Sequence, residues 1–402
     1  MIGKINQAGE AEFMARVDMC KRQFDGDIAH EVYLDNAATT RIDPSVVVEM
    51  ERWYEIPMNP SARHYEGYEA QKVIAKSSKI IADFISATPE EIIFTSGGTE
   101  SNNWAIMRGS KSNRIVIGGG EHSSVVQPAK WLEEQGFDVT VVELDSNGKV
   151  SPVKLQEVVQ KGDLVSIQHA NQETGIVNNI VAISQVVHAV DAYLHVDAVQ
   201  SLGKIPVDVE ELGVDMMSCS GHKIHGPQGI GFSYVRNGIE IAPLIFGGGQ
   251  QEGRRSGTQP VALIAGLGQA VLCAEKAMES INDIVKIREF LESDLHNRLG
   301  FSVVGKDQDR LPTICKIIMR DDLEGDVICS LLDEVGFRVS QGSACESRSK
   351  EKSKILEQMG YNKSEVGSSL RVSLSRYTTR EEVLFLVDAL QRVGDKAAGL
   401  TV

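Results

Sequence analysis

The feature that most constrains the fold is a repeated alternation of short β-branched runs with longer amphipathic stretches, beginning near residue 90. Such β-α units join parallel strands, because the helix carries the chain back to the start of the next strand. A parallel sheet is buried under helices on both faces. The pattern therefore predicts an α/β fold with a mainly parallel central sheet. Strands are expected at 92–95, 114–117, 139–142, 164–168 and 193–196, and helices from residue 100 and at 125–135, 152–160 and 180–192.

The pattern changes after about residue 275, where fewer and longer elements follow. We expect one long helix over about 262–299, strands at 313–319 and 370–374, a helix near 326–335 and a final helix from residue 379. The sequence predicts three parts. These are an N-terminal extension over 1–32 with an additional helix, a large α/β domain over 33–275, and a small α+β domain over 276–402.

Composition excludes several classes of protein. The 41 Lys and Arg against 56 Asp and Glu give a net charge of −15, so direct nucleic-acid binding is not expected. Six scattered cysteines lack zinc-ligand spacing and are too few for a disulfide framework. The longest apolar stretch, Pro260–Ala274, is interrupted by glycines and is expected to be too short to span a bilayer. We expect a cytoplasmic protein with no membrane association and no metal site.

Three polar motifs follow predicted strands, and their order along the chain indicates an active site. Lys223 lies in Ser218-Cys219-Ser220-Gly221-His222-Lys223, a turn typical of lysines that hold pyridoxal phosphate (PLP) as a Schiff base. Asp197 ends a buried strand, where it needs a cation such as a pyridinium nitrogen. Ser96-Gly97-Gly98-Thr99 forms a glycine turn before a helix, which suits a phosphate. Alone, the lysine is equally consistent with a surface turn, so the ordered combination carries the prediction.

With these motifs the chain resembles the cysteine desulfurases, which are PLP enzymes of fold type I and aminotransferase class V, close to the NifS/IscS type. The resemblance extends from Tyr33 to about Arg380. The motifs that carry it are Tyr33-Leu34-Asp35-Asn36-Ala37-Ala38-Thr39-Thr40, Asn59-Pro60-Ser61, Glu121-His122-Ser123-Ser124-Val125, Arg255-Ser256-Gly257-Thr258, Gly342-Ser343-Ala344-Cys345 and Leu370-Arg371-Val372-Ser373-Leu374-Ser375-Arg376-Tyr377-Thr378.

The resemblance implies how the cofactor is held. Lys223 is similar to the Schiff-base lysine, which also moves the substrate proton, and Asp197 to the partner of the ring nitrogen. Gln200 resembles the donor to the ring hydroxyl, and His122 the imidazole stacked on the ring. The implied phosphate ligands are Gly98, Thr99, Ser220, His222 and, from a second subunit, Thr258. A homodimer with shared active sites is therefore implied.

The resemblance also implies the substrate site and the reaction. Arg371 is similar to the arginine that pairs with the carboxylate of L-cysteine, and Asn36 is an expected substrate contact. Gln172 stands where the family usually has an asparagine that contacts the ring hydroxyl and the substrate carboxylate. Cys345 resembles the thiol that takes the substrate sulfur as a persulfide, leaving L-alanine, and passes it to an acceptor protein.

Cys345 lies in a polar segment that cannot pack tightly, so we expect that segment to be mobile. Residues 346–354 hold four basic and two acidic side chains, which leads us to expect an acidic acceptor. Iron–sulfur assembly, tRNA thiolation and DNA sulfur modification are all pathways that such enzymes supply. The other cysteines outside the extension, Cys219, Cys273, Cys315 and Cys329, are expected to be inert packing.

Two other functions remain open at this point. One is a different enzyme on the same fold, either a selenocysteine lyase or another class V aminotransferase-like enzyme. An aminotransferase needs no thiol, so Cys345 argues against it. The other is a non-catalytic docking subunit, which would be expected to lack Lys223, Asp197 or Cys345.

Overall fold

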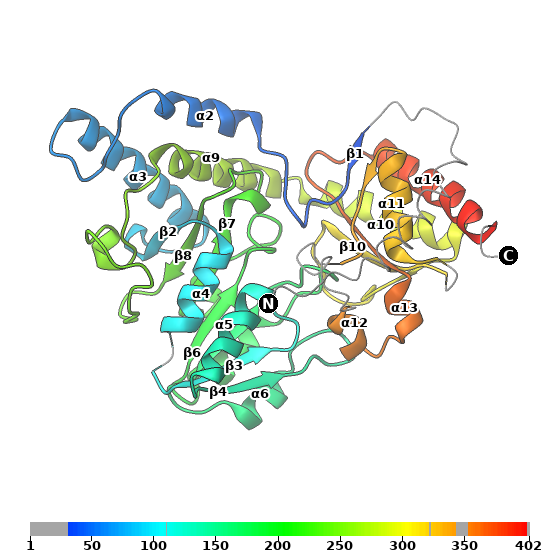
Figure 1. Ribbon diagram of the computed structural model, residues 1–402, viewed down its shortest axis with the longest axis horizontal. Helices are drawn as coiled ribbons and strands as arrows, with labels where there is room; N and C mark the ends of the chain where they lie inside the picture. The colour runs from blue at the N-terminus through cyan, green and yellow to red at the C-terminus, as the bar shows by residue number, and fades with distance from the viewer. Residues whose placement is uncertain (1–30, 110, 321–322, 343–352, 400–402) are drawn as a thin grey trace, which may run out of the picture.

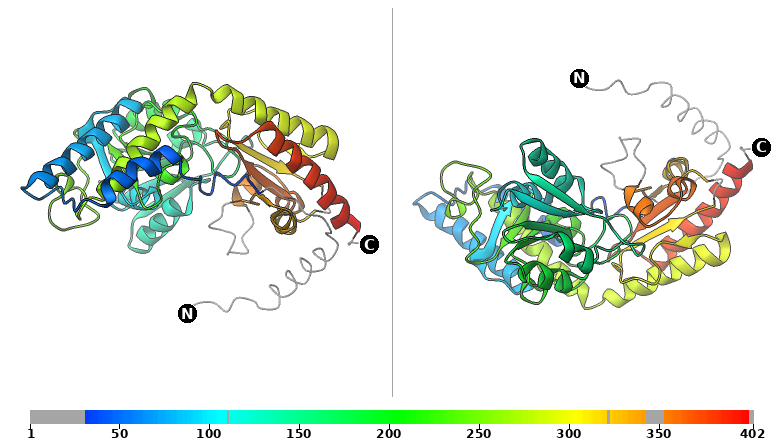
Figure 2. Two further views of the ribbon diagram at one scale, coloured as in Figure 1. Left: turned by 90° about the horizontal axis from the view of Figure 1, so that it is seen from above. Right: turned by 90° about the horizontal axis from the view of Figure 1, so that it is seen from below.

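The computed structural model describes residues 31–109, 111–320, 323–342 and 353–399. Cys345 and residues 1–30 of the predicted extension lie outside these ranges. The described chain forms two lobes side by side, one built on a seven-stranded sheet and one on a three-stranded sheet (Figure 1). Seen from above and below, the two lobes lie end to end along the longest axis of the molecule (Figure 2).

The large sheet is mainly parallel, as the alternation predicts. Its order is β2-β8-β7-β6-β5-β3-β4, and only β8 runs opposite to its two neighbours. The reversal follows from a short connection, because only a single-turn 3-10 helix, and no α-helix, lies between β7 and β8 to return the chain. The strands are β2 (Ile92–Thr95), β3 (Arg114–Gly118), β4 (Asp138–Val142), β5 (Leu164–Gln168), β6 (Tyr193–Asp197), β7 (Met216–Ser220) and β8 (Gly231–Val235).

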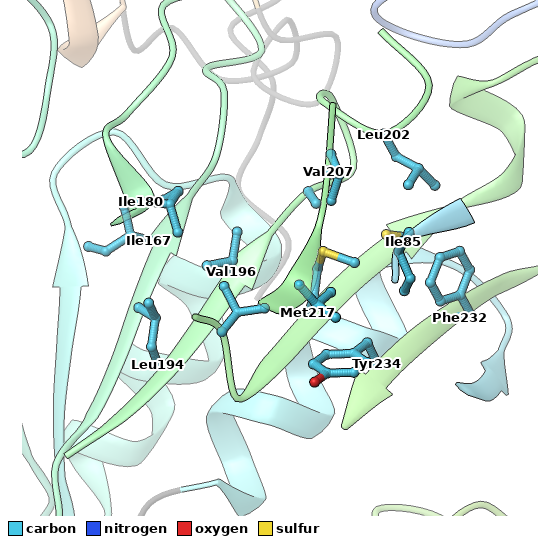
Figure 3. Packing of buried hydrophobic residues seen from close by; sticks show 14 of the residues in the cluster. Ile85, Ile167, Ile180, Leu194, Val196, Leu202, Val207, Met217, Phe232 and Tyr234 are labelled. Atoms are coloured by element: carbon cyan, nitrogen blue, oxygen red, sulfur yellow. The ribbon is translucent and has the colours of Figure 1, made fainter. Parts of the chain in front are cut away.

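Successive side chains of these strands enter different hydrophobic cores on the two faces of the sheet. Ile115 and Ile117 of β3 pack in one core, whereas Val116 between them packs in the other. The larger core is shown in Figure 3, where Val196 and Met217 lie among the apolar side chains of neighbouring segments. Burial on both faces explains why the strands are apolar nearly throughout.

Helices cover both faces of the large sheet and surround the smaller one. In the large lobe they are α2 (Pro44–Tyr54), α3 (Tyr65–Phe84), α4 (Gly98–Arg108), α5 (Ser123–Glu134), α6 (Pro152–Val158), α7 (Ile180–His188), α8 (Val209–Leu212) and α9 (Val261–Met278). The C-terminal part holds α10 (Ile281–Leu299), α11 (Gly325–Glu334), α12 (Lys354–Gln358), α13 (Lys363–Gly367) and α14 (Arg380–Gly399).

The expected single helix over about 262–299 is wrong, because the structure has two helices there. The helix α9 ends at Met278 and α10 begins at Ile281. The apolar stretch is also longer than expected, because the helix α9 continues through its glycines to Met278. By length and composition α9 could cross a membrane, and it packs on α2 and α3. A Cβ on Gly266 would lie 2.6 Å from Met50 Cγ, so the glycine permits this close packing.

The second core lies around an antiparallel sheet of order β12-β10-β9, formed by β9 (Ser302–Val303), β10 (Ile314–Ile318) and β12 (Ser369–Ser373). The first described residues of the chain pack in this core. The strand β1 (Val32–Tyr33) pairs with β11 (Phe337–Arg338), and Leu34 is fully buried among C-terminal residues. Residues 32–34 thus pack with the C-terminal lobe, although the sequence assigned residues from 33 to the large domain. A two-residue strand has too short a pattern to reveal this.

Candidate active site

Most of the predicted site residues meet in one cavity of about 300 Å³. The cavity lies where β6 and β7 end, at the carboxyl edge of the parallel sheet, which is where ligands of such sheets bind. The predicted residues that line it are Gly98, Thr99, His122, Gln172, Asp197, Gln200, Ser220, His222, Lys223 and Arg371.

One end of the cavity is the N-terminus of α4. Its first turn leaves backbone N–H groups without partners inside the helix, and the helix dipole favours an anion there. Gly98 starts this turn, and a Cβ on it would lie 2.7 Å from Val199 Cγ2, so no larger residue fits. Ser220 and His222 line the same cavity. Burial and then the charge of Lys223 lower the pKa of His222 to about 4, so its ring is neutral at pH 7.

The side-chain amide of Asn102 holds Asp197 and also contacts Ser124, the hydrogen-bond partner of His122. One N–H of the Asn102 side chain donates to Asp197 Oδ2 at 2.7 Å, and the other donates to Ser124 Oγ at 2.8 Å. Ser124 Oγ lies 2.7 Å from His122 Nδ1, which also accepts the Ser124 backbone N–H. Because Ser124 Oγ already accepts from Asn102, its hydroxyl donates to Nδ1. We therefore assign the proton of the His122 ring to Nε2.

Lys223 lies in the single-turn helix Gly221–Lys223 directly after β7. Its ammonium donates to the carbonyl oxygens of Ala37 at 2.5 Å and Ala38 at 2.8 Å. These carbonyls belong to the Tyr33–Thr40 motif, so the lysine bridges the N-terminal segment and the large sheet. Gln200 Nε2 donates to the same Ala37 oxygen at 2.9 Å.

Arg371 reaches the cavity from β12 of the second lobe. Its guanidinium is almost fully buried, donates through Nη1 to the Gln172 carbonyl at 2.8 Å, and pairs through Nη2 with Asp35 Oδ1 at 2.7 Å. The Nε atom is buried without a hydrogen-bond partner among the described residues. A buried, charged donor without an acceptor is costly, so this atom is suited to a ligand oxygen.

Three of the predicted site residues do not line this cavity. The Asn36 side chain instead donates to the Ser373 carbonyl at 2.8 Å and lines a smaller, adjacent cavity. Thr258 is exposed, and its segment is tied to α4 by an ion pair between Arg255 Nε and Glu100 Oε1 at 2.8 Å. Cys345 lies outside the described residues.

The four cysteines among the described residues, Cys219, Cys273, Cys315 and Cys329, are free, and Cys219 and Cys315 are fully buried. Burial raises the pKa of Cys219 and Cys315 well above the ordinary value, which makes their thiols poor nucleophiles. Burial also raises the pKa of Cys329 to about 12. Cys273 is partly buried, with its Sγ 3.2 Å from Ser45 Oγ. This environment agrees with inert packing for three of the four cysteines.

A profile of the Aminotransferase class-V family matches residues 32–386. The chain belongs to the class V aminotransferase family. Cysteine desulfurase IscS of Dictyoglomus turgidum is 39% identical over 375 residues, covering 91% of this chain and 95% of that protein.

Solved structures of two similar proteins extend the likeness to three dimensions. A NifS-like protein has a TM-score of 0.84 and 34% identity, covering 91% of this chain and 99% of that one. SspA, solved in complex with cysteine, has a TM-score of 0.75 and 35% identity, covering 86% and 99%. The predicted resemblance and the fold type I architecture are confirmed.

Members of this class V family are PLP enzymes, and the residues present fit that group. The cavity offers a lysine at one wall, a buried carboxylate at the end of β6 and a helix N-terminus for a phosphate. The Asp197 carboxylate accepts two hydrogen bonds, from Asn102 and the Val199 backbone, which leaves lone pairs for a ring N–H.

Sequence reasoning missed several residues that organise this site. Asn102 and Ser124 were not selected, although Ser124 lies in a quoted motif and Asn102 lies one helical turn after Thr99. Asp35 was quoted without a role, and its pairing with Arg371 needs a contact across 336 positions. Lys204 is not distinguishable in the sequence, because a lysine after a glycine is a common pair.

Proposed function

We propose that this protein is a PLP-dependent cysteine desulfurase that releases L-alanine from L-cysteine and passes the sulfur to an acceptor protein through Cys345. The observation that carries the proposal is the meeting of Lys223, Asp197, His122 and Arg371 around one cavity, with one of them coming from the second lobe. The named relatives do not favour a selenocysteine lyase, an aminotransferase or a docking subunit.

When bound, PLP supplies an electron sink that makes the substrate α-proton acidic and the β-carbon–sulfur bond breakable. Lys223 attaches the cofactor and then holds the α-proton at its Nζ atom. Asp197 accepts a hydrogen bond from the ring nitrogen and keeps it positive. The phosphate is held by the first turn of α4 with Thr99, Ser220 and His222. The contacts of Gln200 and Gln172 with the ring hydroxyl remain part of this proposal.

Arg371 binds the substrate carboxylate, and its buried Nε supplies a donor that no described protein group uses. A guanidinium offers two parallel N–H groups to a carboxylate, which a lysine cannot do. His122 presents Nε2–H toward the cavity because its Nδ1 is occupied by Ser124. Asn36 supports this side of the site through the Ser373 carbonyl of β12.

The sulfur step uses the Cys345 thiolate. It attacks the sulfur of the bound substrate, and the carbon–sulfur bond breaks with its electron pair on the β-carbon. Protonation of the β-carbon, and return of the proton held by Lys223 to the α-carbon, complete L-alanine. We further propose a cytoplasmic homodimer in which Thr258 of each chain completes the other chain's phosphate site. The acceptor is a protein with an acidic surface that meets the basic segment after Cys345.

Three measurements on purified protein test the proposal. Added PLP should give a visible absorption band, and L-cysteine should yield alanine and a Cys345 peptide heavier by one sulfur in mass spectra. Lys223→Ala should lose the band and the alanine. Cys345→Ser should keep the band and lose the persulfide. Wild-type protein that stays colourless with PLP would refute the proposed function.

A further inference from the structure

Lys204 is a buried cation that the proposed reaction does not use. Its residue is 9% exposed, in the turn that follows β6, and none of the ion pairs among the described residues includes it. Burial, followed by the charges of Lys223 and Arg371, lowers the pKa of Lys204 to about 7. A positive charge is costly at such a position unless it is paired or hydrogen-bonded.

The ammonium of Lys204 fixes the orientation of an amide beside the catalytic lysine. Lys204 Nζ donates to Gln200 Oε1 at 3.0 Å, while Gln200 Nε2 donates to the Ala37 carbonyl at 2.9 Å. Rotating the amide by half a turn would set N–H against an ammonium and oxygen against a carbonyl. Lys223 Nζ donates to the same Ala37 carbonyl. Lys204 and Lys223 are therefore connected through Gln200 and Ala37.

A small cavity places Lys204 behind Lys223. Its volume is about 40 Å³, enough for a water molecule, and both lysines line it together with Thr313. The Thr313 hydroxyl is buried without a hydrogen-bond partner among the described residues, which suits a bound water. Lys223 also lines the large cavity, so it lies between the cofactor site and this polar space.

The remaining titratable groups near Lys204 are neutral or already paired. His222 and His225 both have a pKa lowered to about 4, in each case first by burial. Arg376 lines the small cavity but pairs with Asp43 at 2.9 Å. Loss of the charge of Lys204 would therefore relieve its repulsion with Lys223 first and with Arg371 second.

We propose that Lys204 is a positioning residue of this site: its ammonium holds the Gln200 amide with N–H toward Ala37, and its charge opposes protonation of Lys223. Repulsion between two cations is mutual, so a charge at position 204 favours the neutral amine that can attach a carbonyl. The inference deepens the proposed function, because it concerns how the cofactor lysine is kept reactive.

The first measurement needs no cofactor. Lys223 in PLP-free full-length protein is acetylated over a range of pH and quantified by peptide mass spectrometry. Lys204→Met should raise the pH midpoint of Lys223 labelling, whereas Lys204→Arg keeps its charge at every pH of the series and should lower it. Lys161→Met is the matched control, because it removes an exposed lysine and should shift nothing. Lys204→Gln replaces Lys204→Met if the latter does not fold.

The second measurement uses the holoenzyme. The pH at which the visible band of bound PLP changes should rise by a similar amount in Lys204→Met, and the PLP dissociation constant should rise about tenfold as the Gln200 amide loses its fixed orientation. Unchanged labelling and band midpoints in the uncharged variants would overturn the role of Lys204. Wild-type protein that binds no PLP would overturn the proposed function, while the labelling measurement would still decide this inference.

Discussion

Replacing Asp35 with asparagine should weaken folding and strengthen substrate binding in the same protein. The variant keeps an oxygen at the position that accepts from Arg371 Nη2 at 2.7 Å, but it removes the negative charge. The Arg371 side chain is 2% exposed and the Asp35 side chain 19% exposed, so the pair is largely shielded from water. Arg371 keeps its second contact, the Gln172 carbonyl at 2.8 Å.

The magnitude for stability follows from this burial. Removing one partner of a buried ion pair costs about 3–5 kcal/mol, because the other charge is left uncompensated. The partial exposure of Asp35 and the acceptor retained by asparagine reduce this to about 2 kcal/mol. Asp83→Asn is the matched control, since the Lys79–Asp83 pair is 68% and 61% exposed and should be worth less than about 0.5 kcal/mol.

Whereas Asp35→Asn should destabilise the fold, it should strengthen the binding of L-cysteine. In the free protein Asp35 partly neutralises the guanidinium that is proposed to bind the carboxylate of L-cysteine, and it also repels that carboxylate. Without this charge the KM for L-cysteine should fall about threefold to tenfold, since a difference of about 1 kcal/mol corresponds to fivefold. Orientation is retained through the Gln172 carbonyl, so loss of preorganisation does not cancel the gain.

Urea unfolding of the PLP-loaded protein and steady-state alanine formation measure the two effects. The reasoning would be refuted if Asp35→Asn unfolded at the wild-type urea concentration, or if its KM rose while Asp83→Asn behaved like wild type. A rise in KM would mean that Asp35 serves mainly to hold Arg371 in place.

Three further predictions concern groups placed by the structure. Burial opposes ionisation of Asp43, but a Tyr377 hydrogen bond and the Arg376 charge are among the interactions that lower its pKa to about 2. Its stabilising effect is therefore present above pH 4 and lost between about pH 4 and 2, so Asp43→Asn should cost about 2 kcal/mol at pH 6 and almost nothing at pH 2 in urea unfolding. Asn102→Ala should weaken PLP binding about tenfold in absorbance titrations, because a charge-assisted hydrogen bond is worth about 1.5–3 kcal/mol, and unchanged affinity would contradict its role. Arg371→Lys should raise the KM for L-cysteine at least tenfold with little change in the visible band, and a band shift instead would connect Arg371 with the cofactor.

The alternation of strands and helices between residues 92 and 197 was predictable because most of these strands are short, largely apolar runs separated by amphipathic stretches. The strand at 164–168 matches β5 residue for residue, and the expected ends of β3, β4 and β6 differ by one residue. The strand β8 was not predicted, and its direction was not predictable either, since a short apolar run reads the same in either direction. Nor was the break between α9 and α10, because the apolar pattern continues across Glu279 and Ser280.

The candidate site was predictable where chemistry is tied to a motif and not where it depends on packing. Lys223 and Asp197 follow strands at spacings that put them on one edge of the sheet. Lys204 and Asn102 act through the tertiary contacts of their side chains, and no local pattern distinguishes them from a solvent-exposed lysine or an ordinary helical asparagine. The acid Asp35 pairs with a residue at the far end of the chain, which only the folded structure reveals.

The two hydrophobic cores hold different parts of the site. Substitutions in one core can therefore affect substrate binding or cofactor binding separately. Asp197, Asn102 and Lys223 are fixed by the large sheet, whereas Arg371 and Asp35 are fixed by β12 and the segment after β1 in the second core. Substitutions in the second core should therefore alter the KM for L-cysteine and leave the visible absorption band of bound PLP unchanged. Substitutions at the ends of β6 and β7 should alter that absorption band first. Gln172 and Ala37 are two of the points where the two halves of the site touch, through Arg371 on one side and Lys223 on the other. Coupling between substrate binding and the protonation of Lys223 should accordingly pass through these two backbone carbonyls, and it should be strongest in variants that change Lys204 and Asp35 together.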